Sequence, residues 1–473
     1  MLPRNAVTFD IRDASTGRPM PGKLSFVGIH GTPLPQFTHR DVGLRIEGGI
    51  AAYHRVMSLS GEGRVEVPHG HYQVTVSRGP EWDAVVIPDL HVGAAPVAIQ
   101  ASLHHVVDTT GWISADFHVH SAASSDCRVP MEDRIFEFAS DGVDMLVSTD
   151  HNYIADYAPL IEELGAQDVL ASMPGDEITT GLWGHFGAMP LAPDAGEAGQ
   201  GAPQVRHRNI AQIFGGIRKT DPAAFVQVNH PRLDEEIGYF DLTGFNAASE
   251  RAPKRMFSFD FDAIEVLNGY QDADRRSIER NIEDWFLLLS HGRRITATGN
   301  SDTHHLHYNL GGYPRNYVQV PDGDPRTLKG ADVARAVRAG RSFFTTGPFV
   351  KVTSGNAGLG DLAPAPGGQA ELDIEVQAAP WVEVGSVTLY LNGVETQRFA
   401  VDPGDATALR FKKHVSVKLE RDTFAVARVD GNRLMWPVVG DGAHFGVRAL
   451  ALTNPIYFDT NGNRRFDAPK PLR

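Results

Sequence analysis

A repeated rhythm in the middle of the chain constrains the fold more than any other feature. Short apolar segments of strand length lie at residues 112–117, 144–149, 169–177, 224–230, 263–268 and 294–300. Helical patterns lie between several of them, at 131–140, 154–164, 210–219, 272–291 and 331–339. This alternation predicts βα units in a mostly parallel sheet or barrel. The carboxyl ends of such strands meet on the face where βα barrels carry their active sites.

Nearly every apolar segment ends in residue types that ligate metals. The acids and histidines at these ends are Asp116, His118, His120, Asp126, Asp150, His151, Asp176, Glu177, His185, His230, Asp302, His304 and His305. A core histidine usually stands alone, so histidines at consecutive strand ends favour a metal centre. His118 and His120 are two residues apart, so both imidazoles lie on one face of a strand. That spacing recurs in His69-Gly70-His71 and His305-Leu306-His307, so it is a weak signal alone.

Composition narrows the class of partner. The 473 residues include 44 Lys+Arg and 58 Asp+Glu, which gives a formal net charge of −14 with no basic block. This balance argues against a nucleic-acid coat role and an anionic membrane surface, and we expect a small-molecule substrate. No apolar run approaches the roughly 18 residues of a membrane helix. The start lacks a signal-peptide core, which leaves export after removal of a leader and a cytoplasmic location both open.

Two further features favour plain structural roles. The single cysteine, Cys127, excludes an intrachain disulfide and a cysteine-rich zinc site, and we interpret it as a small packed residue. Residues 459–467 resemble part of a calcium loop. Arg464 and Lys470 stand where that loop requires Gly and Glu, which favours a polar turn.

Both flanks of the middle region have a β pattern. Short alternating or apolar segments separated by Gly/Pro pairs fill the first hundred residues, where residues 69–71 fall in an expected surface turn. Similar segments return after the Gly/Pro-rich stretch at 347–368. We predict an amino-terminal β-sandwich at 1–108, a central βα unit at 109–350 and a carboxyl-terminal β-sandwich at 351–473.

The ordered motifs of the middle region resemble the PHP superfamily, named for polymerase and histidinol phosphatase domains. They are HVH at 118–120, Asp126, STDH at 148–151, Glu177, GHF at 184–186, NHPR at 229–232, GNSDTH at 299–304 and RSFFTTGP at 341–348. Over roughly residues 112–350 the chain is most similar to the CehA/McbA-like metallohydrolases. The resemblance implies an α/β protein with a distorted (β/α)7-type barrel, here flanked by two small antiparallel β-sandwich domains.

Carried over by motif, the resemblance implies nine metal ligands in three sets. The sets are His118, His120, Glu177 and Asp302 for a first ion, Glu177, His185 and His230 for a second, and Asp126, His151 and His304 for a third. Two alternatives stay open. Asp116 or Asp133 could replace Asp126, and a His185 that points outward would leave the second ion one ligand short.

The donor set also predicts the chemistry. Six imidazoles and three carboxylates suit two or three Zn, Mn or Fe ions rather than Ca or Mg. Such ions acidify a bridging water, and the resulting hydroxide attacks the substrate. Three divalent ions would outweigh three carboxylates, which favours an anionic group. We therefore predict a multinuclear metal-dependent hydrolase that acts on phosphomonoesters or phosphodiesters.

Two other functions stay open. The CehA/McbA (carbaryl hydrolase) branch name implies hydrolysis of a carboxylic ester or aryl carbamate by the same core with an aromatic pocket. Trp183, Phe186, Tyr239 and Phe240 lie near the motifs and could supply that pocket. In the third hypothesis the β-domains are binding modules and the central unit is a degenerate carrier. The complete ligand set argues against it.

Several polar residues near the motifs have two possible roles. Arg232 either grips a substrate phosphate or carboxylate by two bonds or forms a structural ion pair. His305 either protonates a leaving group or is a solvated rim histidine. The residues expected either to bind substrate at the mouth or to support the ligands are Asn152, Tyr239, Glu265 and Asn268.

Overall fold

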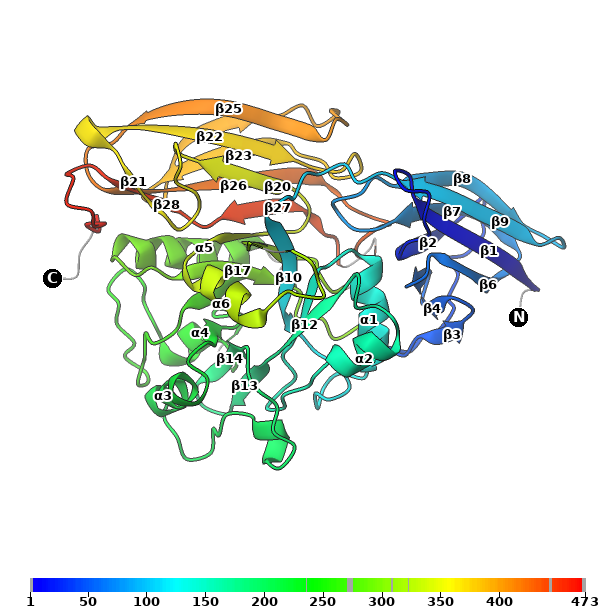
Figure 1. The fold of residues 1–473 in the computed structure, drawn as a ribbon, viewed down its shortest axis with the longest axis horizontal. Helices are drawn as coiled ribbons and strands as arrows, with labels where there is room; N and C mark the ends of the chain where they lie inside the picture. The colour runs from blue at the N-terminus through cyan, green and yellow to red at the C-terminus, as the bar shows by residue number, and fades with distance from the viewer. Residues whose placement is uncertain are drawn as a thin grey trace.

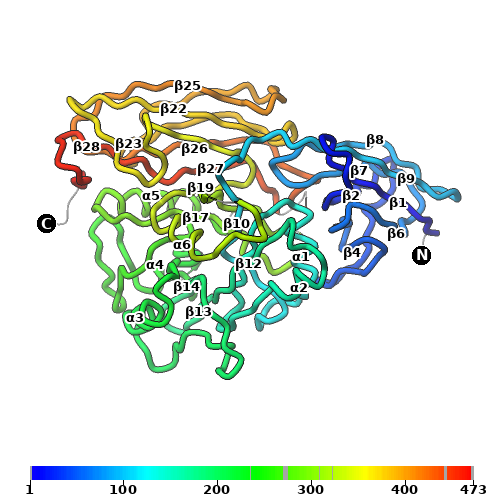
Figure 2. Tube along the Cα trace, in the orientation of Figure 1, coloured from blue at the N-terminus to red at the C-terminus, as the bar shows by residue number. Residues whose placement is uncertain are grey.

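The computed structural model describes residues 3–234, 236–269, 275–307, 309–321, 323–441 and 445–469. These form a mixed α/β fold in which a central unit carries additional β-sheets from both ends of the chain (Figure 1). The amino-terminal sheets lie at one end of the molecule, and the carboxyl-terminal sheets run along one side of the central unit (Figure 2). Within the described ranges, no helix has the length and apolar character needed to cross a bilayer.

The amino-terminal strands form two sheets that share one apolar core. The smaller sheet has the order β6-β1-β9 and the larger β3-β4-β5-β2-β7-β8. Their bounds are β1 Arg4–Asp13, β2 Gly22–Ile29, β3 Leu44–Ile46, β4 Gly49–Ala52, β5 Arg55–Ser58, β6 Glu62–Pro68, β7 Gly70–Ser77, β8 Val85–Val92 and β9 Val97–Leu103. Phe9 of one sheet and Phe26 of the other are buried in this core. The pairing is antiparallel except between β1 and β9, which are parallel.

The central strands divide between two sheets. The strands are β10 Trp112–Val119, β11 Met145–Ser148, β12 Ala171–Pro174, β13 Asp176–Thr180, β14 Gly184–Met189, β15 Phe225–Val228, β16 Ala263–Asn268, β17 Thr296–Asn300, β18 Arg315–Gln319 and β19 Ser342–Thr345. One sheet has the order β13-β14-β15-β16-β17, and the other begins β12-β11-β10-β18-β19. The predicted strand at 169–177 is two strands, one in each sheet, because the chain turns at Gly175. The unpredicted β14 pairs antiparallel with both neighbours, so the centre is less parallel than expected.

The two central sheets meet at the carboxyl ends of their strands. Parallel bridges join Val119 to Thr303 and His151 to Glu177. Toward the opposite ends the space is apolar, and Phe117 of one sheet contacts Phe225 of the other at a ring distance of 5.3 Å. The ends that carry the predicted ligands are therefore brought together, as the βα pattern predicts.

Six α-helices are described. They are α1 Met131–Ser140, α2 Ala158–Glu163, α3 Ile210–Thr220, α4 Tyr239–Thr243, α5 Arg275–Ser290 and α6 Gly330–Arg338. The segment 270–274, where the predicted helix 272–291 begins, lies outside the described residues. Pro130 precedes α1 and two acids occupy its first turn, both of which favour a helix start. α5 packs Trp285 and Phe286 into a core shared with the carboxyl-terminal sheet, beside which it lies in Figure 1.

The carboxyl-terminal strands continue the central sheet. They are β20 Phe349–Thr353, β21 Leu362–Pro364, β22 Gln369–Gln377, β23 Ser386–Leu391, β24 Val394–Ala400, β25 Leu409–Lys418, β26 Thr423–Leu434, β27 Arg448–Thr453 and β28 Ile456–Asp459. β20, β22 and β25 form a separate antiparallel sheet. The others extend the sheet of β10 through pairing of β19 with β27, which gives an 11-stranded sheet. The sheet of β10 therefore contains strands from both sides of the expected boundary at residue 350, and the boundary itself stays a prediction.

A buried ion pair joins the amino-terminal sheets to the central unit. Lys23 Nζ of β2 lies 2.7 Å from both carboxylate oxygens of Asp141, and neither side chain is exposed. Tyr313 donates a further hydrogen bond to Asp141 at 3.1 Å. Because both charges are removed from water, each depends on the other for its stabilisation.

We expect Lys23→Met to lower the free energy of unfolding by about 3 to 5 kcal/mol, because it leaves the Asp141 carboxylate buried and unpaired. Arg12→Met is the matched control, since Arg12 pairs with Glu62 at 3.0 Å on the surface. That substitution should cost about 0 to 1 kcal/mol. Chemical denaturation of both variants checks the difference, and equal losses would contradict it.

Candidate metal centre

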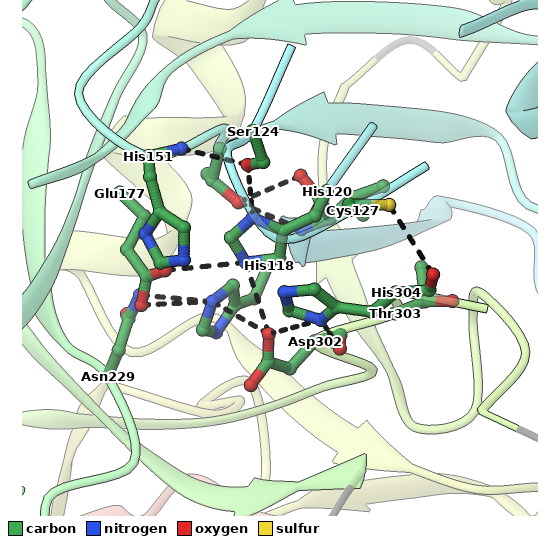
Figure 3. A network of polar contacts seen from close by, with 12 residues as sticks. His118, His120, Ser124, Cys127, His151, Glu177, Asn229, Asp302, Thr303 and His304 are labelled. Atoms are coloured by element: carbon green, nitrogen blue, oxygen red, sulfur yellow. Dashed lines mark hydrogen bonds and ion pairs between the residues drawn. The ribbon is translucent and has the colours of Figure 1, made fainter. Parts of the chain in front are cut away.

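Nine ligand-type side chains converge where the two central sheets meet. β10 carries His118 and ends just before His120, and β13 carries Glu177. The other members follow or lie on neighbouring strands and are Asp126, His151, His185, His230, Asp302 and His304. Figure 3 shows His118, His120, His151 and His304 gathered around the carboxylates of Glu177 and Asp302. These are the nine residues expected from the motifs, His185 included.

The nine residues fall into four overlapping groups in which all potential ligand atoms lie within 4.8 Å of one another. The groups are His120, Asp126, His151 and His304; His118, His120 and Glu177; His118, His230 and Asp302; and His151, Glu177 and His185. Shared members make this one multinuclear cluster rather than separate sites. The grouping differs from the carried-over sets in three ways: His120 also joins the group of Asp126, His230 lies with His118 and Asp302, and His151 also lies with Glu177 and His185.

Glu177 lies at the middle of the cluster. Its Oε1 is 3.1 Å from His118 Nε2, 3.2 Å from His230 Nε2 and 3.3 Å from His185 Nδ1. Its Oε2 is 2.9 Å from His151 Nδ1 and 3.3 Å from His120 Nε2. A carboxylate with imidazoles around both oxygens can bridge two ions.

Asp302 and Asp126 complete the carboxylates of the cluster. Asp302 Oδ1 lies 3.1 Å from His120 Nε2 and 3.2 Å from His118 Nε2. Asp126 Oδ2 lies 2.9 Å from His151 Nε2 and 3.4 Å from His304 Nε2. Asp302 is buried, whereas the Asp126 side chain is 52% exposed. The group that contains Asp126, His151 and His304 is therefore the one that faces solvent.

The structure decides between Asp126 and its two rivals. Asp116 is buried and accepts hydrogen bonds from the backbone N–H groups of Ser301 and Gly312, at 3.1 and 2.8 Å. Burial raises the pKa of Asp116 to about 6. Asp133 accepts from the N–H of Gly43 at 2.6 Å. Both rivals thus hold loops together, and Asp126 lies with the histidines.

The donor set fits bound metal ions. Among the described residues, His120 Nε2, His185 Nδ1 and His230 Nδ1 are buried and have no hydrogen-bond partner. A buried ring nitrogen without a partner loses its hydration and gains nothing in return. Ligation would satisfy His120 and His185 through the nitrogen atoms that already face Glu177.

Three residues in or beside the cluster have a left-handed backbone conformation. His230 has φ 28°, Asp302 has φ 49° and Asn152, beside His151, has φ 51°. Side chains other than glycine rarely adopt this left-handed region, and such residues gather at functional sites. The surrounding structure therefore holds these strand ends in conformations that the local sequence would not choose.

Glu265 on β16 orients two of the ligands from behind. His118 Nδ1 donates to Glu265 Oε1 at 3.0 Å, and the backbone N–H of His230 donates to Oε2 at 2.8 Å. Asn300 and Asn268 add bonds to the same carboxylate at 2.9 and 3.1 Å. A carboxylate behind a ligating histidine fixes its tautomer and raises its basicity. Asn268 also donates to Asp302 at 2.9 Å, so both residues support the ligands.

Three supporting residues were missed in the sequence. Arg134 of α1 donates to the carbonyls of His120, Thr303 and His305 at 2.8, 2.9 and 3.2 Å, and so ties two ligand loops together. Ser124 shares a hydrogen bond with His120 Nδ1 at 2.8 Å, and Thr179 shares one with His151 Nδ1. Arg134 and Thr179 lie far in the sequence from the groups they contact, so no local pattern could identify them, whereas Ser124 is only four residues from His120.

Arg232 forms the structural ion pair rather than an open anion clamp. Its Nε donates to Asp284 at 2.6 Å and its Nη1 to Asp241 at 3.1 Å. Its Nη2 donates to the carbonyl of Phe245 at 2.7 Å, and the side chain is 7% exposed. All three nitrogens are thus bound, since α4 and α5 supply carboxylates that the sequence did not place there.

Tyr239 and Asn152 are both bonded within the fold. Tyr239 is fully buried, stacks on Phe257 at 4.6 Å and accepts a hydrogen bond from the N–H of Ser258 at 2.8 Å. Asn152, which is half-buried, donates to the carbonyl of Thr179 and accepts from its N–H, both at 3.1 Å. The expectation of substrate contact is therefore corrected for Tyr239, because its side chain is enclosed by the core, and for Asn152 it stays a prediction.

His305 lies at the edge of the centre and is held from the amino-terminal part of the chain. Its Nδ1 lies 3.0 Å from Asp41 Oδ2, and its side chain is 33% exposed. The N–H of Leu306 also faces Asp41, at 3.4 Å. His305 is thus an oriented rim residue, and its role as a proton donor stays a prediction.

Opposite charges control the protonation of the cluster. Burial lowers the pKa of His118, but Asp302, Glu177 and Glu265 outweigh it, and the pKa lies well above the usual range. The pKa of His151 is raised to about 11 against its burial, by Glu177 and Asp126. The same contacts hold the pKa of the Glu177 carboxyl well below its usual range, although burial opposes them. Without an ion, the centre therefore holds protonated imidazoles at neutral pH.

Comparison with known proteins finds only weak similarity. No protein-family model matches the sequence, and no curated protein matches it. A two-domain protein from Bacteroides vulgatus ATCC 8482, described as containing a predicted PHP-like metal-dependent phosphoesterase, is 18% identical with a TM-score of 0.40, over 74% of this chain and 97% of that chain. An engineered protein is 10% identical with a TM-score of 0.15, over 69% and 80%. Likenesses this low carry no inference about activity.

We expect Glu265→Gln to weaken metal binding by about 10- to 100-fold, because an amide can no longer accept from both His118 and His230. The matched control is Glu66→Gln, a surface carboxylate 51% exposed. Metal-buffer titration of both variants, with circular dichroism to verify folding, measures the change. Equal affinity in Glu265→Gln and the control would show that this carboxylate does not support the centre.

We also expect metal affinity to rise with pH. Imidazoles that are protonated in the ion-free centre must lose their protons to ligate, so lowering the pH favours the ion-free state. Each proton released should change the apparent affinity about tenfold per pH unit near neutrality. Zinc calorimetry at pH 6, 7 and 8, in buffers of different ionisation heat, counts the protons. A pH-independent affinity would contradict the assignment of these histidines as ligands.

Proposed function

We propose that this protein is a multinuclear metal-dependent hydrolase whose preferred substrates are phosphoesters. The observation that carries the proposal is the single cluster of six imidazoles and three carboxylates at the meeting strand ends. This donor set suits Zn, Mn or Fe, and not the all-oxygen preference of Ca or Mg. When bound, such ions would acidify a bridging water and neutralise negative charge that develops on the substrate.

The protein's own side chains would hold the metal ligands in position and supply negative charge to the ions. Glu177 and Asp302 present carboxylate oxygens between the histidines, and Glu265 fixes the ring of His118. Arg134 holds the loops after β10 and β17 at a constant separation. The solvent-facing group of Asp126 and His304 is the side from which a substrate would enter.

Charge supports the phosphoester class when three ions are bound. Glu265 is a fourth carboxylate at the centre and is buried. Three divalent ions would leave about two positive charges in excess of these four carboxylates, whereas two ions would leave none. The preference for an anionic substrate therefore requires three ions.

Hydrolysis of a carboxylic ester or aryl carbamate, of the CehA/McbA type, is the second candidate. Arg232, the expected phosphate grip, is bound to Asp284 and Asp241. The β13–β14 hairpin, which carries Glu177 and His185, exposes Leu182 at its tip. Leu182 and Met256 are 58% and 55% exposed, and an apolar group could lie against such a rim. Phe186 and Phe240 are fully buried and do not contribute to it.

Rates on four substrates distinguish the two candidates. The zinc- or manganese-loaded protein would be assayed on a nitrophenyl phosphomonoester, a nitrophenyl phosphodiester, a nitrophenyl carboxylic ester and a naphthyl methylcarbamate, with bound metal counted by elemental analysis. We expect a phosphoester to be faster by at least about a hundredfold, with three ions bound. A faster ester or carbamate would establish the second candidate. Four inert substrates with metals bound would contradict both.

Loss of one central ligand should abolish turnover. We expect His118→Ala and Asp302→Ala to lower kcat/KM by at least about a hundredfold. His118 belongs to two groups of the cluster, and the Asp302 carboxylate faces both His118 and His120, so each substitution removes a central ligand. His104→Ala is the control, since His104 is exposed and pairs with Asp83 on the amino-terminal sheets. Thermal unfolding verifies that the variants fold. If both His118→Ala and Asp302→Ala had the same rates as the unmodified protein, the proposal that this protein is a metal-dependent enzyme would be contradicted.

A further inference from the structure

A second cluster of histidines lies on the amino-terminal sheets. β2, β7 and β8 are consecutive strands of the larger sheet. His71 on β7 pairs directly with His91 on β8 and with Ile29 on β2, and His30 follows Ile29. His30 has φ 52°, a left-handed turn at the end of β2. Three adjacent strands thus bring three imidazoles to one end of the sheet.

Two of the three rings face one carboxylate, and the third ring stacks on one of them. His71 Nδ1 lies 2.8 Å from Asp89 Oδ1, and His30 Nε2 lies 3.6 Å from Asp89 Oδ2. Asp89 precedes His91 by two residues on β8, so both side chains lie on the same face. The His71 ring centroid is 5.6 Å from that of His30 and 4.6 Å from that of His91, on which it stacks.

These side chains have no packing role that would explain their convergence. The side chains of His30, His71 and Asp89 are 66%, 40% and 45% exposed. His104, which is also exposed, forms a simple pair with Asp83. Three imidazoles close together repel one another when protonated, whereas one divalent ion would bind all of them in their neutral form.

We propose that His30, His71, His91 and Asp89 form a second site, which binds one divalent transition-metal ion. Three nitrogens and one carboxylate oxygen match the four-coordinate preference of zinc, and imidazole also suits copper and nickel. Asp89 already faces His30 and His71. The four residues do not form one of the groups whose ligand atoms lie within 4.8 Å of one another, so an ion would gather them by rotation of their exposed side chains, which takes nanoseconds. The ion would join β2, β7 and β8 at their ends.

Zinc counting on the full-length protein tests this site. Equilibrium dialysis at a fixed micromolar concentration of free zinc, followed by elemental analysis, gives the ions bound per chain. We expect His71→Asn and His91→Asn each to bind one ion fewer than the unmodified protein, and the double variant to lose no second ion. His414→Asn is the matched control. His414 is exposed and lies 3.0 Å from Glu371 and 2.9 Å from Asp373, without a second histidine in these contacts.

Thermal unfolding provides an independent readout. Zinc added beyond saturation of the central cluster should raise the Tm of the unmodified protein and of His414→Asn, but not that of His71→Asn. Hydrolytic activity should be unchanged in all four variants, so failure of this site and failure of the proposed enzyme function are distinguishable. Equal zinc counts in the unmodified protein and His71→Asn, or an equal loss in His414→Asn, would overturn the proposal.

Discussion

Attraction between the buried carboxylate of Glu177 and the imidazoles around it is the interaction on which the centre depends. Five histidines lie within 3.3 Å of its two oxygens. Removing so many polar groups from water is costly unless each finds a partner of opposite charge. The protein supplies four carboxylates, Glu265 included, for six imidazoles, and three buried ring nitrogens among the described residues of the cluster lack a hydrogen bond. The imidazoles therefore outnumber the carboxylates, and bound cations would give the remaining ring nitrogens a partner.

Holding this arrangement requires a rigid scaffold behind it. Glu265, buried beneath His118, receives hydrogen bonds from four groups. Arg134 fixes the loops after β10 and β17 from the other side, through backbone carbonyls that do not depend on the side chains of those loops. The left-handed conformations of His230 and Asp302 are maintained by this scaffold. Ligand geometry is thus set before any ion arrives, which keeps the cost of binding low.

The sequence predicts the candidate site better than its surroundings for a physical reason. Strand periodicity and strand ends are local properties, and they suffice to bring His118, His120 and Glu177 to one edge of the fold. Whether an arginine can bind a substrate or is already paired depends on residues that are distant in the sequence. Asp284 of α5, which pairs with Arg232, lies more than fifty positions away from it. The split of 169–177 into β12 and β13 likewise follows from tertiary pairing, which local pattern does not encode.

A shared sheet and a buried ion pair join the flanking sheets to the central unit. The 11-stranded sheet runs from β12 without interruption to β24, and the Lys23–Asp141 pair is fully buried between β2 and the end of α1. Asp41, from the amino-terminal segment, holds His305 beside the ligand His304. A binding module carried by a degenerate central unit would not need such contacts with the ligand loops. The amino-terminal sheets therefore act on the centre through the position of His305, and substitutions at Asp41 should be interpreted as changes to the site itself.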